Sequence, residues 1–247
     1  MRYTGRILGE SCYMKRVRDR GVLVIVSSPS GAGKTTLTRR LINEFRPQLE
    51  FSVSYTTRSM RAGEVHGRDY NFVTPERFEE MVRAGDFAEH AFVFSNRYGT
   101  AQAQIDHALS AGHDIIFDVD WQGGQKLSEL WPQDSLKIFI LPPDIKTLEA
   151  RLRSRATDSA EVIERRIRKA KDELGHYPEY QHLIVNDELD HAYGALRAVY
   201  LTRRYGPADR PDIAYPLAAL AANVSDPAPA IAHARSLLQA DTNHGDE

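Results

Sequence analysis

Short apolar runs alternate along the chain with longer segments in which apolar residues recur every three or four positions. Runs rich in β-branched residues predict buried strands at 21–28, 115–120, 136–141 and 182–185. Apolar residues at helical spacing predict helices after Gly33, at 101–111, from about Leu148, and at 190–203. Strands that alternate with helices through short connections predict an α/β fold with a doubly wound parallel sheet.

Residues 51–100 interrupt this alternation with shorter elements. Residues 51–58 alternate as a strand, and a threonine followed by proline at 74–75 is typical of a helix start. Two strand edges, at 92–94 and 98–100, flank a short turn. The segment therefore contains elements that are shorter than those before and after it.

Both ends of the chain differ in character from the middle. Residues 1–20 are basic and lack the apolar stretch of a signal peptide, so we interpret them as an N-terminal extension. Prolines at 207, 211, 216, 227 and 229 interrupt an alanine-rich stretch, so residues 206–247 are expected to form a partly ordered tail outside the main folded core.

Composition narrows the function only slightly. The formal net charge of -2 gives no reason to expect nucleic acid as a partner. Cys12 is the only cysteine in the sequence, which excludes an internal disulfide and suits the reducing cytoplasm. The apolar run at 22–26 is too short to span a bilayer, so no membrane association is expected.

A glycine-rich loop carries the first sign of chemistry. Residues 28–35, Ser-Pro-Ser-Gly-Ala-Gly-Lys-Thr, nearly match G-x-x-x-x-G-K-[ST], between a buried strand and an amphipathic helix. In such a loop, backbone N–H groups converge on phosphate, Lys34 reaches the β- and γ-phosphates and Thr35 ligates Mg²⁺. Ser28 replaces the first glycine, which requires a negative φ there. The expected ATP-binding residues of the loop are Ser30, Gly31, Ala32, Gly33, Lys34, Thr35 and Thr36.

The segment after the loop resembles the guanylate kinase family. The family pattern S-x-T-T-R-x-x-R-x-G-E-x-x-G-x-D-Y stands at residues 54–70, and the resemblance covers about 21–203. It implies a P-loop kinase core at 21–50 and 101–205, an inserted GMP-binding α+β subdomain at about 51–100 and a helical lid at about 151–166. Further matches to the family are Glu89, Tyr98-Gly99-Thr100, Asp118, Asp120, Gln122-Gly123, Ala150, Arg151, Arg155 and Val185-Asn186-Asp187.

The resemblance implies how GMP is bound. Arg58 and Arg61 would bind its phosphate, and Glu89 would accept both the N1–H and the 2-amino group of guanine. Adenine lacks both donors, so a carboxylate here would discriminate against AMP. The other residues expected at the GMP site are Ser54, Glu64, Tyr70, Tyr98, Thr100 and Asp120.

Arginines further along the chain match the family's lid. Arg151, Arg155 and Arg166 would join Lys34 and Arg58 in stabilising the charge of the transferred phosphoryl group. Ala156 follows the second lid arginine where the family usually has glycine.

Asn186 and Asp118 complete the expected site. Asn186 is the expected adenine contact. Asp118 and Asp120 would alternate on one strand and face the same way, with Asp118 assisting Thr35 at the metal.

These observations predict a cytoplasmic guanylate kinase of purine nucleotide metabolism. It would use ATP, GMP and Mg²⁺, and whether it accepts dGMP stays open. Another P-loop kinase, acting for instance on a phosphorylated sugar, is one alternative, although a sugar lacks the paired base donors that a base-reading carboxylate would accept. A non-catalytic guanylate-kinase-like binding domain is the other, although such domains typically lose the loop lysine or the lid arginines, which are present here.

Overall fold

The computed structural model describes residues 20–93, 95–154, 160–206 and 227–239. A five-stranded sheet in the order β2-β7-β1-β8-β9 lies at its centre, and every neighbouring pair in it is parallel. The α/β class with a parallel sheet is thus confirmed. The strands are β1 (Leu23–Ser27), β2 (Leu49–Phe51), β7 (Asp114–Asp118), β8 (Ser135–Leu141) and β9 (His182–Val185).

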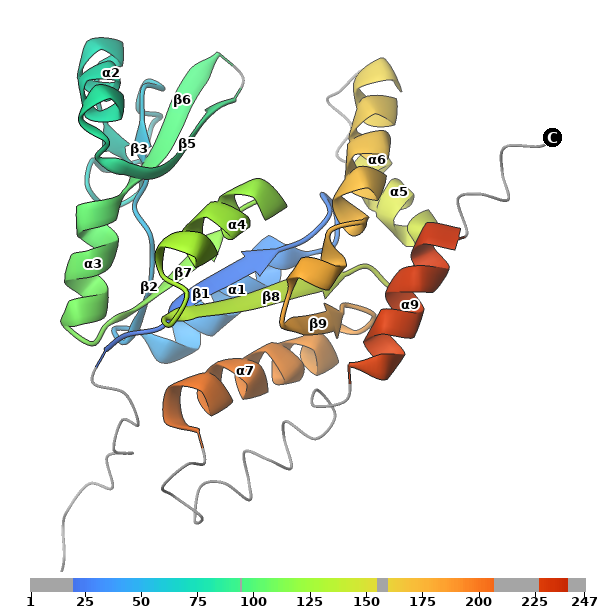
Figure 1. The fold of residues 1–247 in the computed structure, drawn as a ribbon. Coiled ribbons are helices and arrows are strands. Elements are labelled where there is room, and N and C mark those ends of the chain that lie inside the picture. Colours follow the sequence, from blue (N-terminus) through green and yellow to red (C-terminus); the bar gives the residue numbers. More distant parts are fainter. Residues whose placement is uncertain (1–19, 94, 155–159, 207–226, 240–247) are drawn as a thin grey trace, which may run out of the picture.

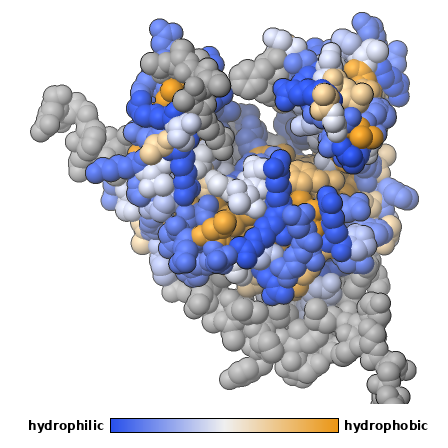
Figure 2. Space-filling model, turned by 180° about the vertical axis from the view of Figure 1, so that it is seen from behind, coloured by the Kyte–Doolittle hydropathy of each residue, from blue (hydrophilic) through white to orange (hydrophobic). Residues whose placement is uncertain are grey.

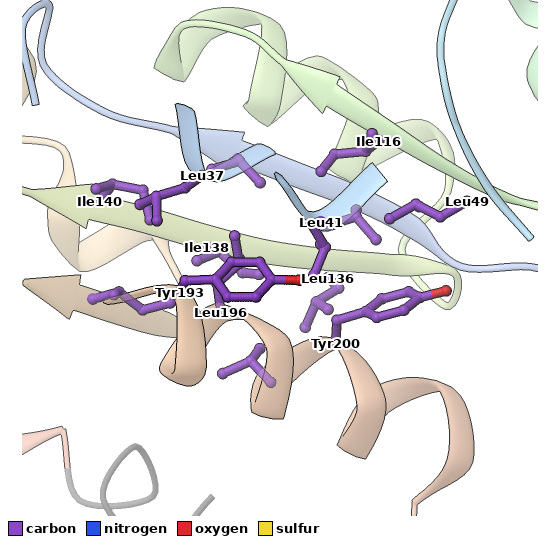
Figure 3. Close-up of a cluster of buried hydrophobic side chains, with 14 of the residues drawn as sticks. Leu37, Leu41, Leu49, Ile116, Leu136, Ile138, Ile140, Tyr193, Leu196 and Tyr200 are labelled. Atoms are coloured by element: carbon purple, nitrogen blue, oxygen red, sulfur yellow. The ribbon is translucent and has the colours of Figure 1, made fainter. Parts of the chain in front are cut away.

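Helices cover both faces of this sheet, as the apolar run at its centre requires (Figure 1). Successive residues of β1 point to opposite faces, and all of them are buried. Val24 and Val26 pack with α1 (Lys34–Phe45) and α7 (Leu189–Tyr205) in the cluster of Figure 3. Leu23 and Ile25 pack on the other side, against α3 (Gln102–Ser110) and α4 (Trp121–Leu130).

A second, four-stranded sheet stands above one side of the first, in the order β4-β3-β6-β5. Thr74 caps α2 (Pro75–Ala84), as expected, by accepting a hydrogen bond from the backbone N–H of Arg77. Phe78 and Phe87 stack in the small core of this unit. Its strands are β3 (Tyr55–Thr56), β4 (Asn71–Phe72), β5 (Phe87–Val93) and β6 (Asn96–Ala101).

The single strand expected at 51–58 is wrong. Phe51 ends β2 in the large sheet, whereas Tyr55 begins β3 in the small one. Between them the chain crosses from one sheet to the other, and the N–H of Ser52 still donates to Ile116 O of β7. Alternating side chains suit either sheet, so periodicity alone does not reveal such a crossing.

Two helices, α5 (Ile145–Ser154) and α6 (Ala160–Leu174), form the lobe on the opposite side from the small sheet (Figure 1). They pack through Leu148 and Leu152 of α5 against Ile167 and Ala170 of α6. The lid was expected in this region. Arg155 and Ala156 lie outside the described residues.

A C-terminal helix, α9 (Ala228–Gln239), packs on the core and was not expected from the proline-rich sequence. Its Ala234 and Leu237 are buried in a cluster with Phe139 and Leu174. His233 also lies 2.8 Å from the carbonyl oxygen of Pro142, which follows β8. None of the described helices is long and apolar enough to cross a membrane.

Two adjacent leucines of α9 provide a test of this packing. Leu237 is 4% exposed and Leu238 is 36% exposed. Leu237→Ala should therefore lower the free energy of unfolding by about 2 kcal/mol, through lost burial and an unfilled cavity. Leu238→Ala should change it by less than about 0.5 kcal/mol. Urea unfolding of both variants measures the difference, and equal effects would show that α9 does not pack as described.

Candidate functional site

The candidate site lies at the carboxyl ends of the central strands, where open α/β sheets bind ligands. A pocket of about 310 Å³ opens there, lined by the glycine-rich loop together with Asp120, Lys169 and Glu173. The four-stranded sheet and the α5–α6 pair lie on either side of this end of the five-stranded sheet. Seen from behind, these two lobes stand apart above the body of the molecule, and much of their surface is hydrophilic (Figure 2).

The backbone of the loop has the geometry that phosphate binding requires. Gly31 and Gly33 have φ values of 92° and 95°, in the left-handed region that favours glycine. A Cβ on Gly33 would lie 2.3 Å from Asn186 Nδ2, so the position also excludes a side chain sterically. No side chain caps the N-terminus of α1, which leaves its first N–H groups available to a ligand.

Ser28 does not disturb the loop. Among the described residues other than glycine, Ser95 alone has positive φ, so Ser28 keeps the negative φ that a Cβ tolerates. Its hydroxyl donates to the carbonyl of Pro29 at 2.9 Å. The departure from the glycine pattern therefore has a local structural accommodation.

Lys34, Thr35 and Asp118 form a compact polar group beside the loop. Lys34 Nζ makes an ion pair with Asp118 and donates to the carbonyl of Val119 at 3.0 Å. The Thr35 hydroxyl donates to the other Asp118 oxygen at 3.0 Å. A hydroxyl and a carboxylate side by side are oxygen donors of the kind that Mg²⁺ takes, with water and phosphate in the remaining positions.

Asp120 does not share a strand with Asp118, so that expectation is wrong. Strand β7 ends at Asp118, and Asp120 is the N-cap of α4. Its Oδ1 accepts from the N–H of Gly123 at 3.0 Å. Aspartate is a preferred N-cap residue, and this local bond ends the extended conformation before Asp120.

A chain of polar side chains in the small sheet surrounds Glu89. The Thr100 hydroxyl donates to Glu89 Oε1 at 3.0 Å and lies 3.3 Å from the Ser54 hydroxyl. Burial raises the pKa of Glu89, the negative charge of Asp120 adds to this, and the bond from Thr100 opposes it. Glu89, Thr100 and Ser54, which are all expected at the GMP site, therefore form one connected group, and Asp120 is close enough to act on Glu89 by charge.

The expected phosphate-binding residues gather beside β4 and β6. The Arg58 guanidinium donates to both oxygens of Glu64, at 2.8 and 3.1 Å, and lies 5.4 Å from the centre of the Tyr70 ring. This pairing lowers the pKa of Glu64 and raises that of Arg58. The rings of Tyr70 and Tyr98 are 5.9 Å apart. Glu64 is thus a direct partner of Arg58, and it also accepts the backbone N–H of Arg61 at 2.8 Å.

Of the residues expected in the lid and at the adenine, Arg151 and Asn186 contact the phosphate loop. Arg151 of α5 lies 3.4 Å from the carbonyl oxygen of Gly31, at the phosphate loop. Arg166 lies on α6 and is half-buried. Asn186 is 6% exposed, and its side-chain amide donates to the carbonyl of Ala32 at 2.7 Å. In this structure the Asn186 amide nitrogen thus contacts the loop itself.

Two pocket residues were missed from the sequence. Lys169 and Glu173 line the pocket from α6, and the Lys169 Nζ lies 3.6 Å from Glu173 Oε1. Their spacing of four residues along one helical face was the available signal. It was hidden among the many basic residues of that segment, which favour a solvated surface.

Comparison with known proteins gives a consistent result. The model of the family described as guanylate kinase matches residues 20–202. A guanylate kinase of Paramagnetospirillum magneticum is 48% identical over 188 residues, covering 76% of this chain and 87% of the relative. One of Rhodopseudomonas palustris is 51% identical over 183 residues, covering 74% and 83%. The crystal structure of guanylate kinase from Anaplasma phagocytophilum has a TM-score of 0.59 at 28% identity, covering 82% and 96%.

Proposed function

The chain belongs to the guanylate kinase family and is a nucleoside-monophosphate kinase, and from this premise we propose which of its residues bind the two nucleotides and transfer the phosphoryl group. The reaction moves the γ-phosphoryl group of ATP to GMP and yields ADP and GDP. The observation that carries the proposal is the Glu89–Thr100–Ser54 group in one lobe, together with a phosphate loop that keeps Lys34 and Thr35.

On the donor side, the loop at 30–36 binds the phosphates of ATP. Its left-handed glycines and the uncapped start of α1 direct backbone N–H groups toward the β-phosphate. Lys34 exchanges its contact with Asp118 for the β- and γ-phosphate oxygens. Thr35, with Asp118 near the water shell, would hold Mg²⁺, which would supply positive charge to the β- and γ-phosphates.

On the acceptor side, Glu89 accepts the two adjacent donors of guanine. Ser54 and Thr100 donate to guanine O6, and Asp120 reinforces the contact with the 2-amino group. The fixed position of Thr100 against Glu89 supports this assignment, because it holds the carboxylate in place before the base arrives. A protonated Glu89 cannot accept both donors, so base recognition requires the ionised form.

The GMP phosphate lies against Arg58, with Arg61, Tyr70 and Tyr98 adding donors. Glu64 holds the Arg58 guanidinium through two bonds and so fixes its plane. Arg58 then presents its remaining N–H groups to the phosphate and keeps the accepting oxygen in line with ATP.

During transfer, negative charge spreads over the equatorial oxygens of the phosphoryl group, and Arg151, Arg155 and Arg166 meet it from the lid. Arg151 already contacts the loop at Gly31, so only a small movement brings it to the phosphates. Closing of the lobes excludes the water that would otherwise hydrolyse ATP. The enzyme acts in cytoplasmic purine nucleotide metabolism, where it converts GMP to GDP.

The two alternatives explain less of the site. A small phosphorylated sugar lacks the adjacent ring N–H and amino donors of guanine that the Glu89 group is proposed to recognise. A non-catalytic binding domain has no need for the contacts that join Lys34 and Thr35 to Asp118.

Arg58→Lys tests the acceptor side of the proposal. Lysine keeps the charge but cannot bind Glu64 and phosphate through a rigid planar fork, so KM for GMP should rise by about tenfold or more. KM for ATP should stay within about twofold. The matched control is Arg68→Lys, in the same segment, where Arg68 pairs with Asp69 at the surface. An unchanged KM for GMP in Arg58→Lys would exclude Arg58 from the phosphate site.

A further inference from the structure

Three consecutive residues of the phosphate loop, 30–32, are hydrogen-bonded by side chains from outside the loop. Arg151 donates to the carbonyl of Gly31 at 3.4 Å. Asn186 donates to the carbonyl of Ala32 at 2.7 Å. The third contact has the opposite polarity, because Glu173 Oε2 accepts the N–H of Ser30 at 3.0 Å. A carboxylate therefore takes a backbone donor in a loop whose donors serve to bind an anion.

Charge alone does not explain Glu173 in this place. The residue is 8% exposed and lines the pocket of the phosphate loop. Within the described part of the chain, the cation paired with it is Lys169, 3.6 Å away, whose side chain is 67% exposed and so largely screened by water. A buried carboxylate beside the phosphates of ATP repels them, so any contribution to binding comes from the geometry that its hydrogen bond imposes.

Glu173 lies at the C-terminal end of α6, so its bond to Ser30 links this helix to the phosphate loop. Arg166 lies about two helical turns earlier on the same helix, on the lid side. The next residue, Leu174, is buried in the cluster that includes α9. The end of α6 is thus fixed to the body of the protein by packing, and Glu173 joins it to the loop across 143 residues of sequence.

From these contacts we propose that Glu173 is a positioning residue for ATP. It holds the Ser30 N–H and thereby sets the direction of the loop's first turn, and it couples the base of α6 to the phosphate loop. The role rests on the proposed binding of ATP by this loop. The partners of the Glu173 carboxylate among the described residues are Ser30 and Lys169, neither of which is assigned to GMP, so its effect is expected on the ATP side.

Steady-state kinetics of Glu173→Ala and Glu173→Gln test the role. In Glu173→Ala the loop loses a charge-assisted bond, and KM for ATP should rise by about tenfold or more while KM for GMP stays within about twofold. Glu173→Gln keeps a carbonyl oxygen for the Ser30 N–H and removes the repelling charge. Its KM for ATP should therefore return to within about threefold of the parent value, or fall below it.

The matched control is Asp172→Ala, which removes an exposed carboxylate from the adjacent position of α6 and should leave both KM values unchanged. Melting temperatures of all three variants accompany the kinetics. An unchanged KM for ATP in Glu173→Ala overturns the proposal, as does a Gln variant as impaired as the Ala variant. A lower melting temperature with an unchanged ratio of the two KM values would make Glu173 merely structural. If the parent protein itself does not phosphorylate GMP, the result would instead contradict the proposed function.

Discussion

Replacing Lys34 by alanine is expected to lower kcat for phosphoryl transfer by at least about 10²–10³-fold, because a fixed positive charge next to the β- and γ-phosphates is lost. The contacts of Lys34 with Asp118 and the Val119 carbonyl show that its ammonium is held at the mouth of the loop. The loss falls on kcat, since charge builds up on the phosphoryl oxygens during the transfer.

The design of this experiment separates chemistry from folding. Lys34→Met keeps the apolar stem of the side chain and should be as inactive as Lys34→Ala. Lys146→Ala removes an exposed lysine from α5 and serves as the control for charge. Calorimetry should show GMP binding unchanged within about twofold, because GMP binds in the other lobe. Near-normal turnover in Lys34→Met would contradict the assignment of the phosphate loop.

Glu89→Gln is expected to reduce kcat/KM for GMP by about tenfold or more, and to shrink the preference for GMP over AMP. Glutamine replaces one acceptor oxygen by an NH₂ group that faces a guanine donor. An unpaired buried donor costs about 1–3 kcal/mol, and more when the lost partner was charged. ATP binding should stay the same. The surface control is Glu80→Gln, whose carboxylate pairs with Arg77 on α2. An unchanged ratio of GMP to AMP would mean that Glu89 does not read the base.

The pH profile of the same variant provides a second readout. Burial raises the pKa of Glu89 above its ordinary value, and only the ionised carboxylate accepts both donors. As pH falls, kcat/KM for GMP should therefore begin to decline at a higher pH than an ordinary glutamate would cause. Glutamine does not titrate, so this part of the decline should be absent in Glu89→Gln. An identical acid limb in both proteins would assign it to another group.

The parts of the site that are local in sequence could be predicted from it. The phosphate loop, the strand before it and the helix after it form one continuous segment, and its spacing determines its geometry. The Arg58–Tyr70 segment likewise carries its pattern within a short stretch. The parallel sheet followed from the alternation of apolar runs with helices, and the structure confirms it.

Contacts between distant residues could not be predicted in this way. Glu173 and Ser30 are 143 residues apart, and nothing near either one indicates the pairing. Asp114 and Arg204 are 0% and 1% exposed. The Arg204 Nε lies 3.2 Å from Asp114 Oδ2, and the Tyr200 hydroxyl donates to the same oxygen at 2.7 Å. Charged residues are seldom fully buried, so residue type alone favours a surface position for both, and only their pairing accounts for the burial.

The strand position expected for Asp120 was wrong and the helix α9 was not predicted, because other interactions outweighed the local sequence pattern. Asp120 was assigned to a strand by its spacing from Asp118, but capping of α4 stabilises a different conformation. The α9 helix lies in a segment whose prolines and alanines favour disorder by composition. Its burial depends on contacts with Phe139 and Leu174, which no local pattern reveals.

A comparison of acceptors tests the central claim most directly. The purified protein, with ATP and Mg²⁺, is assayed for nucleoside diphosphate formation from GMP, AMP, UMP and dTMP at equal concentrations. The Glu89 group predicts that GMP is phosphorylated with a kcat/KM at least about 10³-fold above each of the others, because only guanine offers both donors to the carboxylate. Comparable or faster phosphorylation of AMP, UMP or dTMP would contradict it.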